Sequence, residues 1–207
     1  MPIKNILIDL GGVLYEIDIQ STIEKYRKMQ APDAEPVNFS KKGQHEYFSL
    51  LDCGQIEIDE FAQGLKDSYS LEGSIDEIKQ IWLELLIGVI PGRIEQVKTL
   101  AQRYNLALLS NTGRFHRDFY YPQCKPMFDQ MDYLFYSFEM GVRKPDSEIY
   151  EMALRETGWK AEETLFLDDS KNNIEAAQDL GIHTHWIETY DDFEEMMNIY
   201  AGKNVPS

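Results

Sequence analysis

The sequence predicts an α/β protein with a parallel β-sheet that is covered by helices on both faces. Short apolar runs alternate with segments of helical periodicity, which is the pattern of repeated βα units. The 207 residues are 43% hydrophobic, so the chain can bury one full core and an additional subdomain. Polar side chains directly follow several apolar runs, at the sheet edge where open α/β proteins bind their ligands.

The strands of this sheet are expected at residues 5–10, 106–109, 133–137, 164–167 and 184–187. Helices are expected between and after them, at residues 91–104, 147–157, 173–180 and 191–200. The first of these helices has Pro91 and Gly92 near its start, and proline is common at the first helical position.

The long segment between the first two strands is expected to form a helical subdomain. It exceeds a normal crossover connection, and its periodicity predicts helices at residues 19–29, 44–51, 59–68 and 74–86. The last of these begins with a capping-box pattern, Ser74 followed by Glu77. We therefore divide the chain into a core of residues 1–14 and 89–207 and an insertion of residues 15–88. The insertion starts just after the first strand, so it should lie over the strand ends as a cap.

The composition restricts the partners that the protein can have. The formal net charge is −16, from 36 acidic and 20 basic residues, which argues against nucleic acid or an anionic membrane as a partner. A small anionic ligand and a divalent cation remain compatible with this charge. No apolar run reaches membrane-spanning length, so we expect a cytoplasmic protein without an anchor or an evident protein partner. Cys53 and Cys124 have no ligand spacing and are expected to be free thiols.

Chemically active side chains follow four of the predicted strands. Taken singly, each has an ordinary interpretation as a turn acid, a helix cap or a solvated lysine. Together, at the ends of parallel strands, they are the groups that phosphoryl transfer requires. They are Asp9 beside Gly11 and Gly12, then Ser110 and Asn111, then Lys144, and finally the adjacent pair Asp168 and Asp169.

Four motifs around these residues resemble those of the haloacid dehalogenase-like (HAD) hydrolase superfamily. In chain order they are Ile-Leu-Ile-Asp-x-Gly-Gly-Val, Leu-Leu-Ser-Asn-Thr, Arg-Lys-Pro and Phe-Leu-Asp-Asp-Ser-x-x-Asn. The resemblance implies a Rossmann-like parallel-sheet HAD core, and the insertion resembles the all-helical C1-type cap of that superfamily. The Asp-Leu-Gly start, with Ser-Asn-Thr and Arg-Lys-Pro, most resembles the branch of sugar-phosphate phosphatases that contains α-D-glucose-1-phosphate phosphatase.

The resemblance implies an Mg²⁺-dependent phosphomonoesterase that acts on a small phosphorylated metabolite, such as a sugar phosphate, through an aspartyl-phosphate intermediate. Asp9 would be the nucleophile, and Lys144 would neutralise the phosphate and keep Asp9 ionised. The phosphate would be bound by Leu10, Gly11, Ser110, Asn111 and Lys144. Mg²⁺ would be held by Asp9, the Gly11 carbonyl and Asp169, with Asp168 as a ligand through water or as a supporting acid.

One position departs from the pattern of this superfamily. Most of its phosphatases have a second aspartate, the general acid and base, where this chain has Gly11. One interpretation is that another residue replaces it, with Glu16, Asp18 and His116 as nearby candidates. A second is that the leaving group needs little protonation, as in a sugar 1-phosphate. A third is a slow relative, or a non-catalytic module that binds a phosphorylated ligand or a protein.

The metal-independent 2-haloacid dehalogenases are an alternative, because that branch also lacks the second aspartate. Those enzymes generally have a tyrosine at the position of Gly11 and no acid pair in the fourth motif, so Asp168 and Asp169 favour the metal-dependent phosphatase. For substrate contacts, the cap offers His45, Glu46, Tyr47 and Phe48 as candidates, and most of these four are expected to be ordinary helix-face residues. His116 is expected on a helix surface, outside the site.

Overall fold

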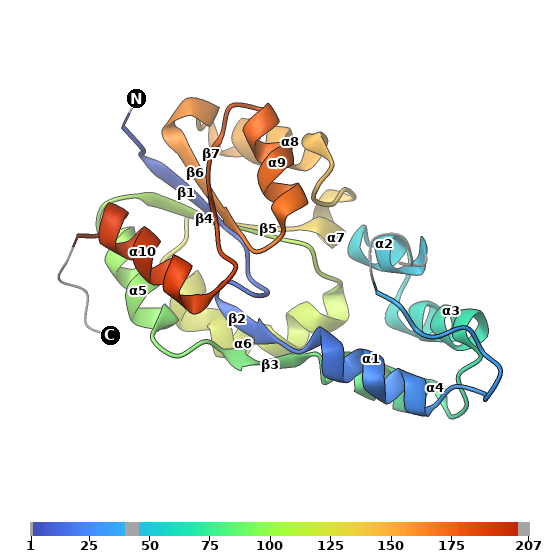
Figure 1. Ribbon diagram of the computed structural model, residues 1–207. Helices are drawn as coiled ribbons and strands as arrows, with labels where there is room; N and C mark the ends of the chain where they lie inside the picture. The colour runs from blue at the N-terminus through green and yellow to red at the C-terminus, as the bar shows by residue number, and fades with distance from the viewer. Residues whose placement is uncertain (1, 40–45, 203–207) are drawn as a thin grey trace.

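A five-stranded parallel sheet forms the centre of the protein (Figure 1). The structure is a computed structural model, and it describes residues 2–39 and 46–202. The strand order is β5-β4-β1-β6-β7, which places β1 in the middle of the sheet. All four strand pairs are parallel, so the predicted α/β class is confirmed. The strands are β1 Asn5–Ile8, β4 Asn105–Ser110, β5 Tyr133–Tyr136, β6 Thr164–Asp168 and β7 His183–Trp186.

Alternate side chains of the central strands enter two separate hydrophobic cores. Ile6 and Ile8 pack with α5, α6 and α10, whereas Leu7 packs with α8 and α9 on the other face. All three side chains are fully buried, which explains why these three positions of β1 are apolar. These helices are α5 Arg93–Ala101, α6 Arg114–Phe128, α8 Ser147–Thr157, α9 Lys171–Asp179 and α10 Tyr190–Tyr200.

Between residues 18 and 85, the described part of the chain forms four helices with a hydrophobic core of their own. Aromatic rings dominate that core, among them Tyr26, Phe48, Phe61 and Trp82. The helices are α1 Ile19–Lys28, α2 Glu46–Asp52, α3 Ile58–Tyr69 and α4 Ile75–Leu83. Figure 1 shows them grouped at one side of the molecule, beyond the sheet. That residues 15–88 form a separate subdomain stays a prediction.

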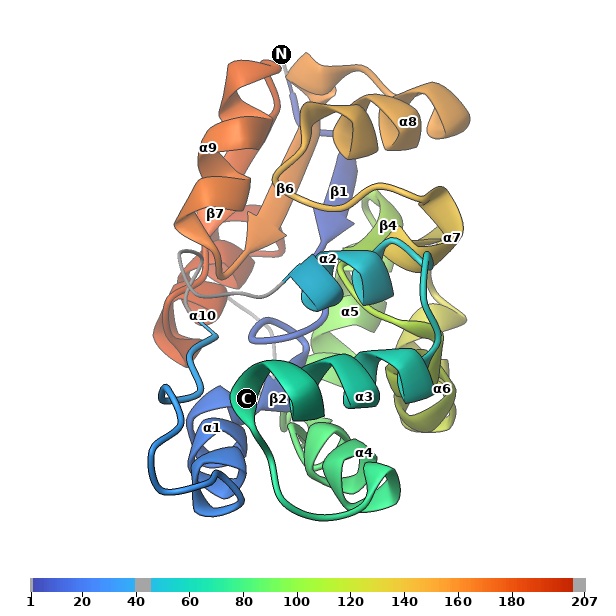
Figure 2. The ribbon, with the colours of Figure 1, turned by 90° about the vertical axis from the view of Figure 1, so that its right-hand side faces the viewer.

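Several elements differ from the sequence prediction. An antiparallel strand pair, β2 Tyr15–Ile17 and β3 Leu86–Val89, joins the helical segment to the core. The helix α6 was not among the predicted helices, although His116 was expected on a helix, because Pro122 and Pro126 normally interrupt helices. A four-residue helix, α7 Ser137–Met140, follows β5, and α2 packs against it (Figure 2). A 3-10 turn spans Ala161–Glu163.

Two further expectations concern compartment and thiols. Among the helices of the described residues, none is both long and apolar enough to cross a membrane. Cys53 and Cys124 are both free thiols, as expected.

Candidate active site

Asp9 lies at the C-terminal end of the central strand. Its backbone N–H donates to the Leu167 carbonyl at 2.9 Å and so extends the pairing of β1 with β6 by one residue. The chain then turns tightly around the Leu10 carbonyl, which accepts hydrogen bonds from the backbone N–H groups of Val13, Leu14 and Tyr15. Backbone hydrogen bonds before and after the Asp9 side chain thereby hold its carboxylate at the C-terminal end of the central strand.

Lys144 joins Asp9 to Asp168. Its Nζ lies 2.8 Å from Asp9 Oδ1 and 2.7 Å from Asp168 Oδ2, and it also donates to the Leu109 carbonyl. The lysine side chain is only 1% exposed. Buried charges are stable only when they are paired. The Lys144 ammonium and the two carboxylates therefore hold one another in position.

Asn111 holds the loop that carries Lys144. Its Oδ1 accepts from the Lys144 N–H, and its Nδ2 donates to the Lys144 carbonyl, both at 2.9 Å. The predicted phosphate ligand Asn111 thus also has a structural role. Ser110 is buried at the end of β4 and is not among the residues that line the cavity described below, whereas Asn111 and Thr112 are. Leu10 is buried in the core and does not line that cavity either.

The acidic cluster has strongly perturbed proton affinities. Burial raises the pKa of Asp9 to about 8, with the charges of Asp168 and Asp169 adding to the effect and Lys144 opposing it. Burial and the charge of Asp168 raise the pKa of Asp169 to about 6. Burial alone would lower the pKa of Lys144, but the carboxylates of Asp168 and Asp9 outweigh it, and the pKa is raised.

Three carboxylates at this edge could hold a metal ion. Ligand oxygens of Asp9, Asp168 and Asp169 all lie within 4.8 Å of one another. Both oxygens of Asp168 are already used, because Oδ1 accepts from the Ser170 N–H and Asn173 Nδ2, and Oδ2 accepts from Lys144. Carboxylate oxygens are the ligands that Mg²⁺ prefers, so the donor set fits this cation.

Two neighbours orient Asp169. Trp186 donates from Nε1 to the Asp169 carbonyl at 2.9 Å. Gly12 lies opposite, in the left-handed region at φ 76°, and a Cβ there would lie 2.5 Å from Asp169 Oδ2. Only glycine meets both conditions, the positive φ and the absence of a side chain.

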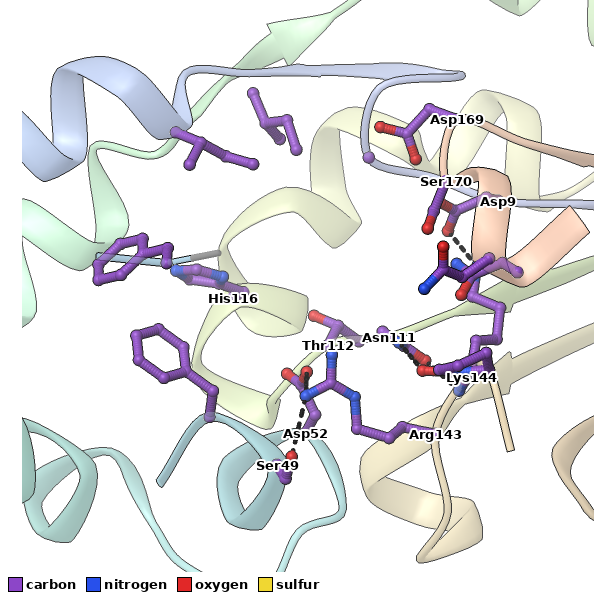
Figure 3. Close-up of a pocket in the computed structure, with 18 of the residues that line it drawn as sticks. Asp9, Ser49, Asp52, Asn111, Thr112, His116, Arg143, Lys144, Asp169 and Ser170 are labelled. Carbon is purple, nitrogen blue, oxygen red and sulfur yellow. Dashed lines mark hydrogen bonds and ion pairs between the residues drawn. The ribbon is translucent and has the colours of Figure 1, made fainter. Parts of the chain in front are cut away.

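A cavity of about 630 Å³ opens from these residues toward the helical segment (Figure 3). Its end at the sheet is polar and includes Asp9, Gly11, Asn111, Thr112, Lys144 and Asp169. Its far wall is apolar and comes from the helical segment and the strands that join it to the core, with Ile17, Phe39, Phe48, Trp82 and Leu85. Arg143 crosses between the two parts, because its Nη1 lies 3.2 Å from Asp52 Oδ2 and 3.3 Å from Ser49 Oγ.

The candidates for a replacement acid differ in position. Glu16 is exposed, and Asp18 accepts from the Ser21 N–H as the N-cap of α1. Neither lines the cavity. His116 does line the cavity and is only 7% exposed, so its predicted place on a helix surface was wrong. The reason is tertiary: α4 covers this face of α6, with the Trp82 ring stacked on the imidazole.

The four cap candidates for the pocket differ in position. Phe48 lines the cavity, Glu46 is exposed and Tyr47 lies outside the lining, while His45 falls outside the described residues. Arg143 was missed although it directly precedes Lys144, and that position was the available signal. Asp52 and Ser49 were missed because nothing in the local sequence of α2 separates them from other helix residues.

Comparisons with known proteins all indicate the same family. The model of the haloacid dehalogenase-like hydrolase family matches residues 3–181. The chain is 31% identical over 202 residues to the D-ribitol-5-phosphate phosphatase of Bacteroides thetaiotaomicron, covering 95% of this chain and 98% of that protein. It is 28% identical over 187 residues to the sesquiterpene phosphatase of Aspergillus oryzae, covering 86% and 87% of the two chains.

A solved structure agrees with these sequence matches. It is the magnesium complex of a HAD family enzyme from Bacteroides thetaiotaomicron, with a TM-score of 0.80, 28% identity and coverage of 95% of this chain and 99% of that one. The expectation of a HAD-type hydrolase is therefore confirmed. This chain belongs to the haloacid dehalogenase-like hydrolase family.

Proposed function

We propose that the protein is an Mg²⁺-dependent phosphomonoesterase that acts on a small phosphorylated metabolite through phosphorylation of Asp9. The observation that carries the proposal is the contact of the Asp9 carboxylate with Lys144, beside Asp169, at the polar end of a cavity. The relatives named as phosphatases support it, since both match most of the chain.

Asp9 and Asp169, with the carbonyl of Gly11, would hold the cation. Asp168 is assigned a supporting role, because its oxygens already bind Lys144, Ser170 and Asn173. When bound, Mg²⁺ supplies positive charge that neutralises the phosphoryl oxygens. The magnesium complex of the related enzyme supports this choice of metal.

The proposed chemistry has two displacements at phosphorus. An oxygen of Asp9 forms a bond to phosphorus, the ester P–O bond breaks, and the released alkoxide takes up a proton. Water then cleaves the aspartyl phosphate, and inorganic phosphate leaves with regeneration of the Asp9 carboxylate. Lys144 opposes the rise in the pKa of Asp9 that burial causes and offsets the charge of the phosphate, and a bound Mg²⁺ would favour the ionised carboxylate further. Residues 15–88 act as a cap, which excludes water from the cavity.

Of the three candidates for a replacement acid, Glu16 and Asp18 do not line the cavity, and His116 lies well apart from Asp9 (Figure 3). Gly11 has room for a substitution, since a Cβ there would meet only the flexible end of Ile17, at 3.3 Å from Cδ1. We expect Gly11→Asp to raise kcat for alkyl phosphates, because general acid–base catalysis contributes roughly 10²- to 10⁴-fold. Gly11→Ala controls for the contact with Ile17. Unchanged kcat in a folded Gly11→Asp variant would show that a missing acid does not limit the rate.

Two substrate classes are favoured by different observations. A polyol or sugar phosphate is favoured by the relative that acts on D-ribitol 5-phosphate. An isoprenoid phosphate is the second candidate, favoured by the apolar wall of Phe39, Phe48 and Trp82 and by the sesquiterpene phosphatase relative. The metal-independent dehalogenase alternative is disfavoured by the cluster of three carboxylates.

The test is a panel of phosphate esters assayed with Mg²⁺ and with EDTA. We expect phosphate release that requires Mg²⁺ and is abolished by Asp9→Asn, which removes the nucleophile with little change in shape. Full activity in Asp9→Asn would contradict the assigned site. Halide release from a 2-haloacid in EDTA would support the dehalogenase alternative, and tight ligand binding without any turnover would support a non-catalytic module.

A further inference from the structure

His116 is a buried histidine that the proposed phosphoryl chemistry does not use. It lies in the first turn of α6, and its ring stacks on Trp82 with centroids 4.8 Å apart and planes at 23°. It lines the cavity, but Figure 3 shows it well apart from Asp9, Lys144 and Asp169. The part of a substrate that reaches His116 is therefore the organic group and not the phosphate.

The hydrogen bonds of His116 determine its tautomer. Nε2 lies 2.9 Å from the Trp82 backbone carbonyl, which can only accept, so Nε2 carries the proton. Burial lowers the pKa of the ring to about 4, and the N-terminal end of α6 also disfavours a positive charge there. The ring is thus neutral near pH 7, and its other nitrogen, Nδ1, is an acceptor.

Nδ1 is available to a ligand. Within the described part of the chain it has no hydrogen-bond partner. The buried side-chain atoms that lack both a partner and accessible surface belong to Arg93, Arg117, Tyr120 and Tyr136. Nδ1 is not one of these atoms among the described residues, so it keeps accessible surface, and the residue that carries it lines the cavity. An acceptor at the wall of a mostly apolar region strongly favours a ligand that can donate to it.

We propose that His116 determines substrate specificity by accepting, at Nδ1, a hydrogen bond from a hydroxyl group of the substrate's organic part. The inference rests on the proposed phosphatase function and deepens it. The hydrogen bond to Nδ1 selects hydroxylated esters, such as polyol or sugar phosphates, over hydrocarbon esters of the same length. The apolar rings of Phe48 and Trp82 are suited to the C–H faces of such a carbon chain.

Two variants separate the two nitrogens. In His116→Gln, the side-chain amide lies near the position of Nε2, so it can still donate to the Trp82 carbonyl. This variant has no acceptor near the position of Nδ1. His116→Asn places an amide oxygen near Nδ1 but gives up the contact with Trp82. The substrates are D-ribitol 5-phosphate and pentyl phosphate, which share a five-carbon chain and differ in the hydroxyl groups.

We expect His116→Gln to lower the ratio of kcat/KM for D-ribitol 5-phosphate to that for pentyl phosphate by about 10- to 100-fold, the effect of one lost hydrogen bond in a buried site. His116→Asn should keep most of the ratio. Equal losses on both esters would show that His116 is merely structural and would overturn the inference. A second measurement needs no variant: in the wild-type protein, one single-deoxy analogue of D-ribitol 5-phosphate should lose about 10-fold or more in kcat/KM.

The outcomes for the two proposals are distinct. If the wild-type protein hydrolyses both esters without preference, the role of His116 is refuted and the phosphatase function stands. If it hydrolyses isoprenoid or pentyl phosphates better than D-ribitol 5-phosphate, the apolar wall dominates recognition and the inference is again refuted. If no phosphate ester is hydrolysed, both proposals fail together.

Discussion

At the scale of single residues, Gly12 shows how the backbone and the acidic cluster depend on each other. We expect Gly12→Ala to weaken Mg²⁺ binding, because its Cβ would lie 2.5 Å from Asp169 Oδ2 and displace the carboxylate. Gly158→Ala is the matched control, since Gly158 has a similar φ of 70° and nothing within 4 Å of its added Cβ. Titration of Mg²⁺ by calorimetry measures both variants. Equal Mg²⁺ affinities in the two variants would contradict the account.

The pKa of Asp9 leads to a prediction about stability and pH. The folded state holds a proton on Asp9 up to a pH of about 8, whereas the unfolded chain releases it near 3.8. Because the folded state binds more protons in this window, the free energy of unfolding should fall as the pH rises from 5 to 8 in EDTA. Asp9→Asn should flatten this slope. Denaturant unfolding at several pH values measures this slope. An identical slope in Asp9→Asn would refute the raised pKa of Asp9.

At the scale of elements, Arg143 links the core to α2. Its guanidinium lies 3.2 Å from Asp52 Oδ2, and both side chains are 18% exposed. We expect Arg143→Ala to raise KM more than it lowers kcat, because α2 loses its charged contact beside the cavity. Hydrogen exchange should become faster in α2 and remain unchanged in α8. Lys98→Ala is the control, since Lys98 pairs with Glu95 on the exposed surface of α5. Equal effects of the two variants would contradict the proposed link.

The elements also show what could be predicted from sequence. The strands β1, β4 and β6 were found because each is an apolar run that polar residues directly follow. The strand β2 was missed because three residues do not establish a period. The strand β3 was missed because it overlaps the end of the predicted helix 74–86 and contains Gly88. The helix α6 was missed because of its internal prolines, and with it the burial of His116. The motif residues were predictable, whereas the cavity wall depends on how α2 and α4 pack against the core.

At the scale of the whole molecule, a bound cation should stabilise the fold. A ligand at 100 times its Kd adds about 2.7 kcal/mol to the free energy of unfolding. For a chain of this size that corresponds to a rise in Tm of roughly 5–11 °C. We expect Mg²⁺ to produce such a shift, EDTA to reverse it and Asp169→Asn to abolish it. A full shift in Asp169→Asn, measured by differential scanning calorimetry, would show that the cation binds elsewhere.

The central claim is that Asp9 carries the phosphoryl group. The most direct measurement is rapid acid quenching of the enzyme during turnover of D-ribitol 5-phosphate, followed by peptide mass spectrometry. The account predicts the added mass of one phosphoryl group on the peptide that contains Asp9, present with Mg²⁺ and absent with EDTA. Turnover without this modification, or a phosphoryl group on another residue, would contradict the claim.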